Sequence, residues 1–320
     1  MAERTRRRGD HLVSVATEHK AVLDPLSRLA QRGYQVTLLP VAPHGQTDAG
    51  RLDPQQVADA ITDDTCLVSV MLANNEIGVI QPLAEIANIC RERGVLLHCD
   101  ATQAVGKIPV HVRELGVDLM SFTAHKLYGP KGIGALYVRG RDPIVRLDAQ
   151  INGGGQQAGR RSGTLNVPGI VGFARAVELC VDNAASRSSS DAGCRLTTLR
   201  TRLWRRLHAE LPGVELIGPV LDALDESGEP LRLPHNLNVS FSDVEGEAIL
   251  LRTPNVAASS GAACSSSDPA PSHVLAALGL GEGQIRSSLR FGLGRFTMAE
   301  EIEQAADGLV AAVRQLRTLL

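Results

Sequence analysis

Short apolar runs alternate with helix-like patterns along the first part of the chain. We predict a strand where β-branched or apolar residues follow one another, and a helix where apolar residues recur every three or four positions. The predicted strands are residues 11–16, 34–39, 66–72, 95–99 and 118–123. The predicted helices are residues 21–32, 54–61 and 82–93, the last with a proline in its first turn.

This alternation of strands and helices predicts an α/β fold. Parallel strands joined by helices form a sheet that is covered by helices on both faces. Ligands of such sheets bind at the carboxyl ends of the strands, so functional residues are expected directly after the strands.

A second, smaller domain is predicted in the C-terminal part. A helix at residues 168–180 is followed by the polar stretch 182–191, which is typical of a junction. Beyond it, the pattern predicts an amphipathic helix at 194–211, a strand at 236–241 and a helix at 298–319. We therefore expect a large domain at residues 1–181 and a smaller α+β domain at residues 182–320, as the length of 320 residues allows.

The composition is that of an ordinary globular protein. Hydrophobic residues make up 43%, charged residues 21%, and the formal net charge is -2. This balance does not favour a nucleic-acid partner, and the short run Arg6-Arg7-Arg8 is interpreted as a solvated edge. The apolar runs are shorter than a membrane span and the N-terminus lacks a signal-peptide pattern, so we expect a cytoplasmic protein without a membrane partner.

The six cysteines show neither a CxxC pair nor the spacing of a metal site. We therefore predict no metal, and five of the cysteines are interpreted as small apolar side chains in a reducing compartment. Cys264 differs, because it lies in residues 257–271, which are rich in Ser, Gly, Ala and Pro. It is either an exposed thiol without a function or a nucleophile on a mobile loop.

Two charged residues follow neighbouring predicted strands. Asp100 ends one strand, and it is a candidate helix cap, metal ligand or partner of a buried cation. Lys126 follows the next strand and is one of four lysines against 29 arginines. A lysine retained in so arginine-rich a chain indicates a task that arginine cannot perform, such as losing its proton and forming a Schiff base.

An aspartate and a lysine in these places suit pyridoxal-phosphate chemistry. A carboxylate keeps the pyridine nitrogen protonated, and an amine holds the aldehyde. The glycine-rich residues 129–134 match neither GxGxxG nor the Walker pattern, so we interpret them as a tight turn.

Six sequence blocks carry a specific resemblance. They are Thr17-Glu18-His19-Lys20-Ala21-Val22, Asn74-Asn75-Glu76-Ile77-Gly78, His98-Cys99-Asp100-Ala101-Thr102-Gln103, Thr123-Ala124-His125-Lys126-Leu127-Tyr128-Gly129-Pro130-Lys131-Gly132, Arg161-Ser162-Gly163-Thr164 and Ser259-Ser260-Gly261-Ala262-Ala263-Cys264. In this order they resemble the NifS/IscS-like cysteine desulfurases, class V of the fold-type I pyridoxal-phosphate enzymes. The likeness runs from about residue 11 to the C-terminus, and it implies a large domain of the pyridoxal-phosphate-dependent transferase type.

The resemblance implies a pyridoxal 5'-phosphate cofactor and a role for each residue around its ring. Lys126 would hold the cofactor as a Schiff base and then move protons at the substrate Cα. His19 would stack on the ring and take part in catalysis. Asp100 would pair with the ring nitrogen, and Asn75 and Gln103 would contact the phenolic oxygen.

Further roles concern the phosphate and the substrate. Thr123 and His125 would bind the phosphate, together with Thr164 from the other subunit of a homodimer. Without the resemblance, Arg290 would be interpreted as an ordinary surface arginine. The resemblance implies that it binds the substrate carboxylate together with Asn75. Cys264 would be the nucleophile.

The implied reaction converts L-cysteine to L-alanine. The Cys264 thiolate attacks the substrate sulfur and keeps it as a persulfide, which supplies iron-sulfur cluster or thio-cofactor assembly through an acceptor or scaffold protein. Two alternatives remain open at this point. One is a selenocysteine lyase or another class V lyase or aminotransferase, and the other is a catalytically inactive partner subunit.

The sequence departs from the family before its first block. Relatives carry a preceding stretch with a Gly-Ala-Thr turn at a helix N-terminus that binds the phosphate. We expect that the start of the chain is assigned too late, while a fragment or a split protein completed by another chain are the alternatives.

Overall fold

The computed structural model describes residues 5, 9–185, 189–261 and 271–319. The chain divides into two compact units. Unit 1 comprises Met1–Leu39, Asp53–Ala73 and Gln81–Asn183, and unit 2 comprises Pro40–Leu52, Asn74–Ile80 and Ala184–Leu320. The domain boundary after residue 181 stays a prediction, and no pattern in the sequence indicated that two short N-terminal segments lie in unit 2.

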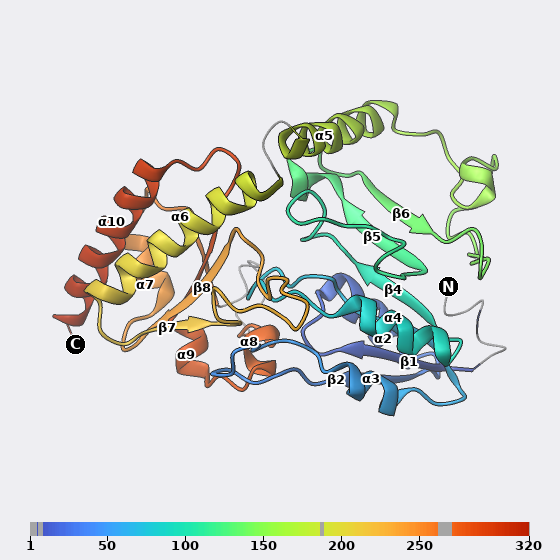
Figure 1. The fold of residues 1–320 in the computed structure, drawn as a ribbon, viewed down its shortest axis with the longest axis horizontal. Helices are drawn as coiled ribbons and strands as arrows, with labels where there is room; N and C mark the ends of the chain where they lie inside the picture. The colour runs from blue at the N-terminus through green and yellow to red at the C-terminus, as the bar shows by residue number, and fades with distance from the viewer. Residues whose placement is uncertain (1–4, 6–8, 186–188, 262–270, 320) are drawn as a thin grey trace. The chain divides into compact units, whose positions relative to one another are not determined.

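Unit 1 is built on a six-stranded sheet in the order β2-β1-β3-β4-β5-β6 (Figure 1). The strands are β1 His11–Val15, β2 Gln35–Leu39, β3 Thr65–Ser69, β4 Leu96–Asp100, β5 Leu119–Thr123 and β6 Gly134–Val138. The first five pair in parallel, and only β6 runs antiparallel, against β5.

Helices cover both faces of this sheet. They are α2 Lys20–Ala30, α3 Pro54–Ala60, α4 Leu83–Glu92 and α5 Val167–Ala185, with short 3-10 turns η1 Ala124–Leu127 and η2 Gln157–Gly159. Helix α2 leads from β1 to β2, toward one edge of the sheet, whereas α4 leads from β3 to β4, toward the opposite edge. Because such crossovers are right-handed, α2 and α4 lie on opposite faces. The prediction of a mainly parallel sheet sandwiched by helices is confirmed.

Unit 2 contains a four-stranded antiparallel sheet in the order β7-β8-β10-β9. Its strands are β7 Val214–Ile217, β8 Asn236–Phe241, β9 Ser259–Ser260 and β10 Ser288–Gly292, and its helices are α6 Ser189–Glu210, α7 Gly246–Arg252, α8 His273–Ala277, α9 Glu282–Arg286 and α10 Ala299–Arg317. Helices α6 and α10 pack against each other (Figure 1).

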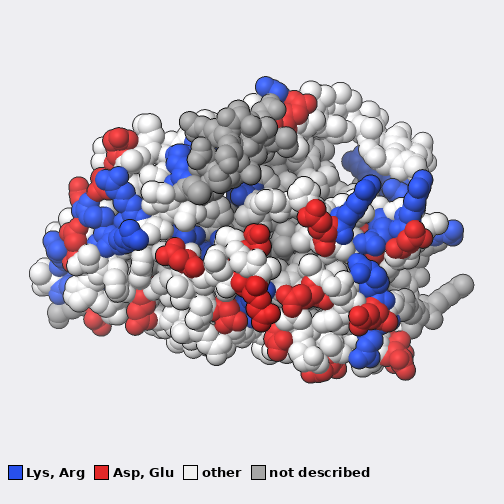
Figure 2. Space-filling model, in the orientation of Figure 1, with Lys and Arg blue, Asp and Glu red and all other residues white. Residues whose placement is uncertain are grey.

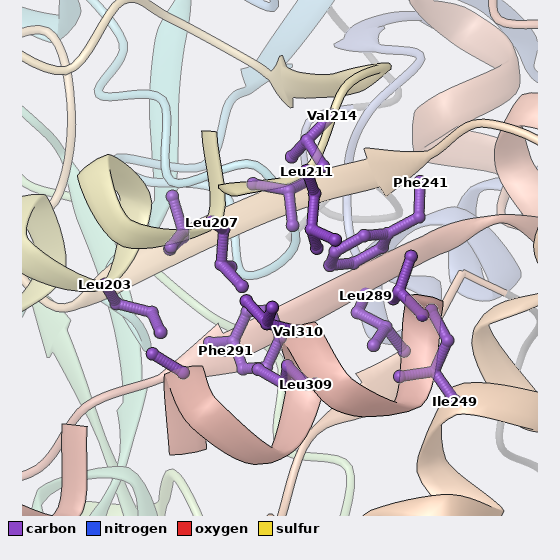
Figure 3. Close-up of a cluster of buried hydrophobic side chains, with 14 of the residues drawn as sticks. Leu203, Leu207, Leu211, Val214, Phe241, Ile249, Leu289, Phe291, Leu309 and Val310 are labelled. Carbon is purple, nitrogen blue, oxygen red and sulfur yellow. The ribbon is translucent and has the colours of Figure 1, made fainter. Parts of the chain in front are cut away.

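The core of unit 2 lies between its helices and its sheet. Figure 3 shows Leu207 of α6, Phe291 of β10 and Leu309 of α10 pointing toward one another. All three are nearly inaccessible to solvent. Positive and negative side chains are interspersed over the face shown in Figure 2, in keeping with a net charge of -2.

The polar stretch 182–191, interpreted as a junction, contains the point at which the chain passes from unit 1 to unit 2. Helix α5 continues to Ala185 and α6 begins at Ser189, so most of the stretch is helical. Serine and aspartate cost little in the first turn of a helix, where their side chains can accept backbone hydrogen bonds. Among the described helices, none is both long and apolar enough to span a bilayer.

Candidate active site

The carboxyl ends of β1 and β3 form the topological switch point of the unit 1 sheet. From β1 the chain crosses toward β2, and from β3 it crosses in the opposite direction toward β4. Open α/β sheets bind their ligands outside the carboxyl ends of the strands at such a point. Glu18 and His19 follow β1 here, and Asp100 ends β4 next to β3.

His19 occupies the N-cap position of α2. Its Nδ1 accepts a hydrogen bond from the backbone N–H of Ala21 at 3.1 Å. The imidazole is exposed, so its ring face is available to a ligand. The cap thus fixes the ring at the start of the helix while leaving it accessible.

The side chain of Glu18, the residue before His19, is completely buried. Its Oε2 accepts a hydrogen bond from the backbone N–H of His19 at 3.2 Å. Burial, and next the nearby negative charge of Asp100, raise the pKa of Glu18 well above its usual value. The backbone N–H of Met71, just after β3, opposes the shift by donating a hydrogen bond. The neutral acid is therefore favoured at this position.

Asp100 lies at the buried end of β4, with 9% of its surface exposed. Its Oδ1 accepts the backbone N–H of Thr102 at 2.9 Å, so part of its role is the turn cap that the sequence allowed. Within the described part of the chain, no salt bridge reaches this carboxylate and no cluster of three or more His, Cys, Asp or Glu could hold a metal. Gln103, half-buried, lies in the same turn.

Lys126 lies in η1, directly after β5. Because β4 and β5 are parallel neighbours, with Asp100 opposite Ser121, the segments after them begin at the same edge of the sheet. The side chain of Lys126 is exposed. The tight turn predicted at residues 129–134 connects η1 to β6, and Tyr128 before it adopts a left-handed conformation with φ of 67°.

Thr123 and His125 flank this lysine in the sequence. The Thr123 hydroxyl donates to the Ile133 carbonyl at 3.2 Å and shares a hydrogen bond with Nδ1 of His125 at 3.0 Å. The second ring nitrogen of His125 points away from this pair by the geometry of the imidazole, and the side chain is exposed. The single proton of the Thr123 hydroxyl is donated to the Ile133 carbonyl, so Thr123 can donate to an anion only in place of that bond, and His125 can donate through Nε2 only in a form that carries a proton there.

Sequence reasoning missed Lys107. This half-buried lysine lies near Lys126, and burial followed by the Lys126 charge lowers the pKa of Lys107 to about 8. It too is one of only four lysines in the chain. The scarcity of lysine that singled out Lys126 would therefore have found it.

Asn75 and Arg290 lie together in unit 2. The guanidinium of Arg290 donates to the Asn75 carbonyl at 3.1 Å and to the Ser259 hydroxyl at 3.1 Å. The two residues predicted to bind the substrate carboxylate are thus in direct contact although they are far apart in the sequence.

One predicted site residue among those described is not brought to either group. Thr164 is exposed in the segment before α5, and its predicted contact is with another subunit. Cys264 lies outside the described residues. The functional roles of all the site residues stay predictions.

The residues at the edge of the unit 1 sheet fit a pyridoxal phosphate. The decisive feature is the Asp100 carboxylate, buried without a cationic partner among the described residues, because a protonated pyridine nitrogen would neutralise it. Lys126 offers an exposed amine for the aldehyde, His19 an exposed ring face, and Thr123 and His125 donors for the phosphate.

Comparison with known proteins identifies the family. The family model described as Aminotransferase class-V matches residues 1–305. The chain is 51% identical over 314 residues to the cysteine desulfurase IscS of Anaeromyxobacter dehalogenans, covering 98% of this chain and 72% of the relative. It is 46% identical over 313 residues to that of Klebsiella pneumoniae, with the same shares covered.

Solved structures agree with this assignment. A NifS-like protein is similar with a TM-score of 0.84 at 33% identity, covering 98% of this chain and 78% of the other. DndA from Streptomyces lividans has a TM-score of 0.71 at 37% identity, covering 91% and 76%. Since the family model spans most of the chain and the relatives match nearly all of it, this protein belongs to the class-V aminotransferase family, among the cysteine desulfurases.

Proposed function

We propose that this protein is a pyridoxal-phosphate-dependent cysteine desulfurase that converts L-cysteine to L-alanine and supplies the sulfur for iron-sulfur cluster or thio-cofactor assembly. The observation that carries the proposal is the position of Asp100 and Lys126 in the fold. They follow adjacent parallel strands at one edge of the unit 1 sheet, and we propose that one small aromatic ring lies between them. Family membership supports the same reaction.

The cofactor would be held mainly by residues after the strands of unit 1. Lys126 would bind its aldehyde, Asp100 would pair with its ring nitrogen and His19 would stack on its face. Thr123 and His125 would donate to its phosphate. When bound, the cofactor supplies an electron-accepting ring that labilises bonds at the substrate Cα and Cβ.

The residues around the ring have distinct tasks. Asp100 would hold a positive charge at the ring nitrogen, and its burial would strengthen that pairing because the local dielectric is low. The amine of Lys126 would act as the base that takes the Cα proton and as the acid that returns protons to the product. Asn75 and Gln103 would orient the ring by hydrogen bonds to its phenolic oxygen.

The sulfur transfer requires a thiolate, for which we propose Cys264. Its sulfur bonds to the substrate sulfur while the substrate Cβ–S bond breaks, and the electron pair of that bond remains on the carbon side. A proton on Cβ completes alanine, and the transferred sulfur remains as the Cys264 persulfide. Arg290 and Asn75 would hold the substrate carboxylate during this step.

The working unit that we propose is a homodimer, because Thr164 would reach the phosphate of the partner subunit. The persulfide would be passed to an acceptor or scaffold protein. We propose a reducing compartment such as the cytoplasm, in which buried cysteines such as Cys90 and Cys99 stay as thiols.

The proposed function can be tested by comparing two lysine variants of the full chain incubated with pyridoxal phosphate. The wild-type protein should turn yellow, absorbing at roughly 420 nm, and should release alanine from L-cysteine. Lys126→Ala should lose both properties by at least about a hundredfold, because neither covalent attachment nor proton transfer remains. Lys131→Ala, in the adjacent exposed turn, is the matched control and should retain both. A Lys126→Ala variant that still releases alanine at the wild-type rate would refute the assignment.

A further inference from the structure

Hydrogen bonds within unit 2 hold Arg290 in place, and the proposed function gives these hydrogen bonds no role. Arg290 lies on β10, paired in register with Asn238 of β8 on one side and with Ser259 of β9 on the other. Its guanidinium is half-buried and donates one hydrogen bond to the Ser259 hydroxyl and one to the Asn75 carbonyl. Both partners are neutral, and among the described residues no acidic side chain forms a salt bridge with Arg290. The positive charge is thus held in place without being neutralised.

The segment that Arg290 contacts is itself fixed to the same sheet. Asn236 donates from Nδ2 to the carbonyls of Asn75 and Glu76, at 3.3 and 3.2 Å. Asn238 donates to the Glu76 carbonyl at 3.2 Å, and both asparagines are buried. The Ser272 hydroxyl donates to the Glu76 carboxylate.

We propose that Ser259 is a positioning residue that presets Arg290 to bind the carboxylate of an amino-acid substrate. The proposal rests on the proposed function, in which Arg290 and Asn75 take that carboxylate. An arginine side chain has many rotamers, and fixing them before the substrate arrives lowers the entropy lost on binding. Two of the five N–H donors hold the guanidinium and leave three for the ligand.

A positioning role of Ser259 affects the binding of the substrate carboxylate and leaves the rate of the chemical step nearly unchanged. Removing the Ser259 hydroxyl leaves Arg290 tied only to Asn75, so the guanidinium samples other orientations. Binding of L-cysteine should weaken about threefold to tenfold, while kcat changes by less than about twofold. Cysteamine is cysteine without its carboxylate, so its binding should not change.

The experiment compares Ser259→Thr with Ser259→Val in the full-length protein loaded with pyridoxal phosphate. Threonine and valine have the same shape and both suit a strand, but only threonine keeps the hydroxyl. The measurements are KM and kcat for L-cysteine and the inhibition constant of cysteamine. Ser259→Val should raise KM by the stated factor, Ser259→Thr should stay near the wild type, and the cysteamine constant should be equal in all three.

Ser260→Ala is the matched control. Ser260 follows Ser259 on β9 and pairs with Leu289 of β10. The side chain of Leu289 lies in the core, on the opposite face of the sheet from Arg290. Its KM should equal that of the wild type. Equal KM values for Ser259→Thr and Ser259→Val, or a parallel loss of cysteamine binding, would overturn the proposal while leaving the proposed function intact. A wild-type protein that releases no alanine would instead overturn the proposed function.

Discussion

At the scale of single residues, the least expected feature is the pair of carboxyl groups formed by Glu18 and Asp100. Glu18 is completely buried and faces a second carboxylate across the ends of β1, β3 and β4. Burial and the nearby charge of Asp100 both disfavour the ionised form of Glu18, which raises the pKa of Glu18 well above its usual value. Cys99 beside them carries a thiol whose pKa is raised by its burial and by Glu18 and Asp100.

The pKa of Glu18 predicts how stability depends on pH. In the folded protein Glu18 keeps its proton, whereas in the unfolded chain it ionises above a pKa of about 4.5. The folded state therefore binds more protons in this range, and its stability decreases as the pH rises from the unfolded toward the folded pKa. Glu18→Gln, which is neutral at every pH, should remove this decrease.

Thermal unfolding of the wild type and Glu18→Gln between pH 4 and pH 8 would test this prediction. The midpoint of Glu18→Gln should rise relative to the wild type as the pH increases. Glu226→Gln, at an exposed position, should follow the wild type across the same range. A constant difference between Glu18→Gln and the wild type would show that Glu18 ionises normally in the folded protein.

At the scale of elements, unit 2 depends on an arginine as much as on its apolar core. Arg232 has 2% of its surface exposed and donates to the carbonyls of Pro219 and Ile217, at 2.6 and 2.5 Å. Burial, and then the neighbouring charge of Arg200, lower its pKa to about 9. The guanidinium thus binds the carbonyl of Ile217, the last residue of β7, and the carbonyl of Pro219 just after it.

Arg232→Leu should reduce the free energy of unfolding by about 2–5 kcal/mol, because two buried carbonyls lose their donors. Chemical denaturation would measure this loss. Arg205→Leu, on the exposed side of α6, should change the free energy by no more than about 0.5 kcal/mol. Equal stabilities of the two variants would contradict the structural role of Arg232.

At the scale of the whole molecule, the predicted site residues divide between the two units. Unit 1 carries the groups assigned to the cofactor, and unit 2 carries Asn75 and Arg290, assigned mainly to the substrate. Thr164 belongs to unit 1 in sequence but is predicted to act in the other subunit of a homodimer. Each of these groups of residues is carried by a unit that folds around its own sheet.

A shared site predicts complementation between two impaired subunits. In a hybrid of Lys126→Ala with Thr164→Ala, one site of the dimer would receive both native residues. If the variants are unfolded and refolded together in equal amounts, half of the dimers are hybrids, and activity should recover to about a quarter of the wild type. Each variant refolded alone should stay below this value. Absence of recovery, with hybrids demonstrated by differential tagging, would place Thr164 outside the shared site.

Much of the fold could be predicted because secondary structure leaves a local periodic signal. The strand predicted at residues 236–241 coincides with β8 Asn236–Phe241, and the predicted strands and helices of unit 1 match the observed ones within a few residues. The strands and α-helices that were not predicted are β6 in unit 1 and β7, β9, β10, α7, α8 and α9 in unit 2, all of them seven residues long or shorter.

The sequence alone determined the order of strands and helices in unit 1 up to β5, the placement of Asp100 and Lys126 after two successive strands, and the resemblance to the family. These properties depend on residues close together in the chain. Only the tertiary structure decided that Glu18 shares its buried place with Asp100, that residues 40–52 and 74–80 lie in unit 2, and that Ser259 holds Arg290. Such contacts depend on strand register and chain crossings, which bring distant residues together and leave no periodic trace in the sequence.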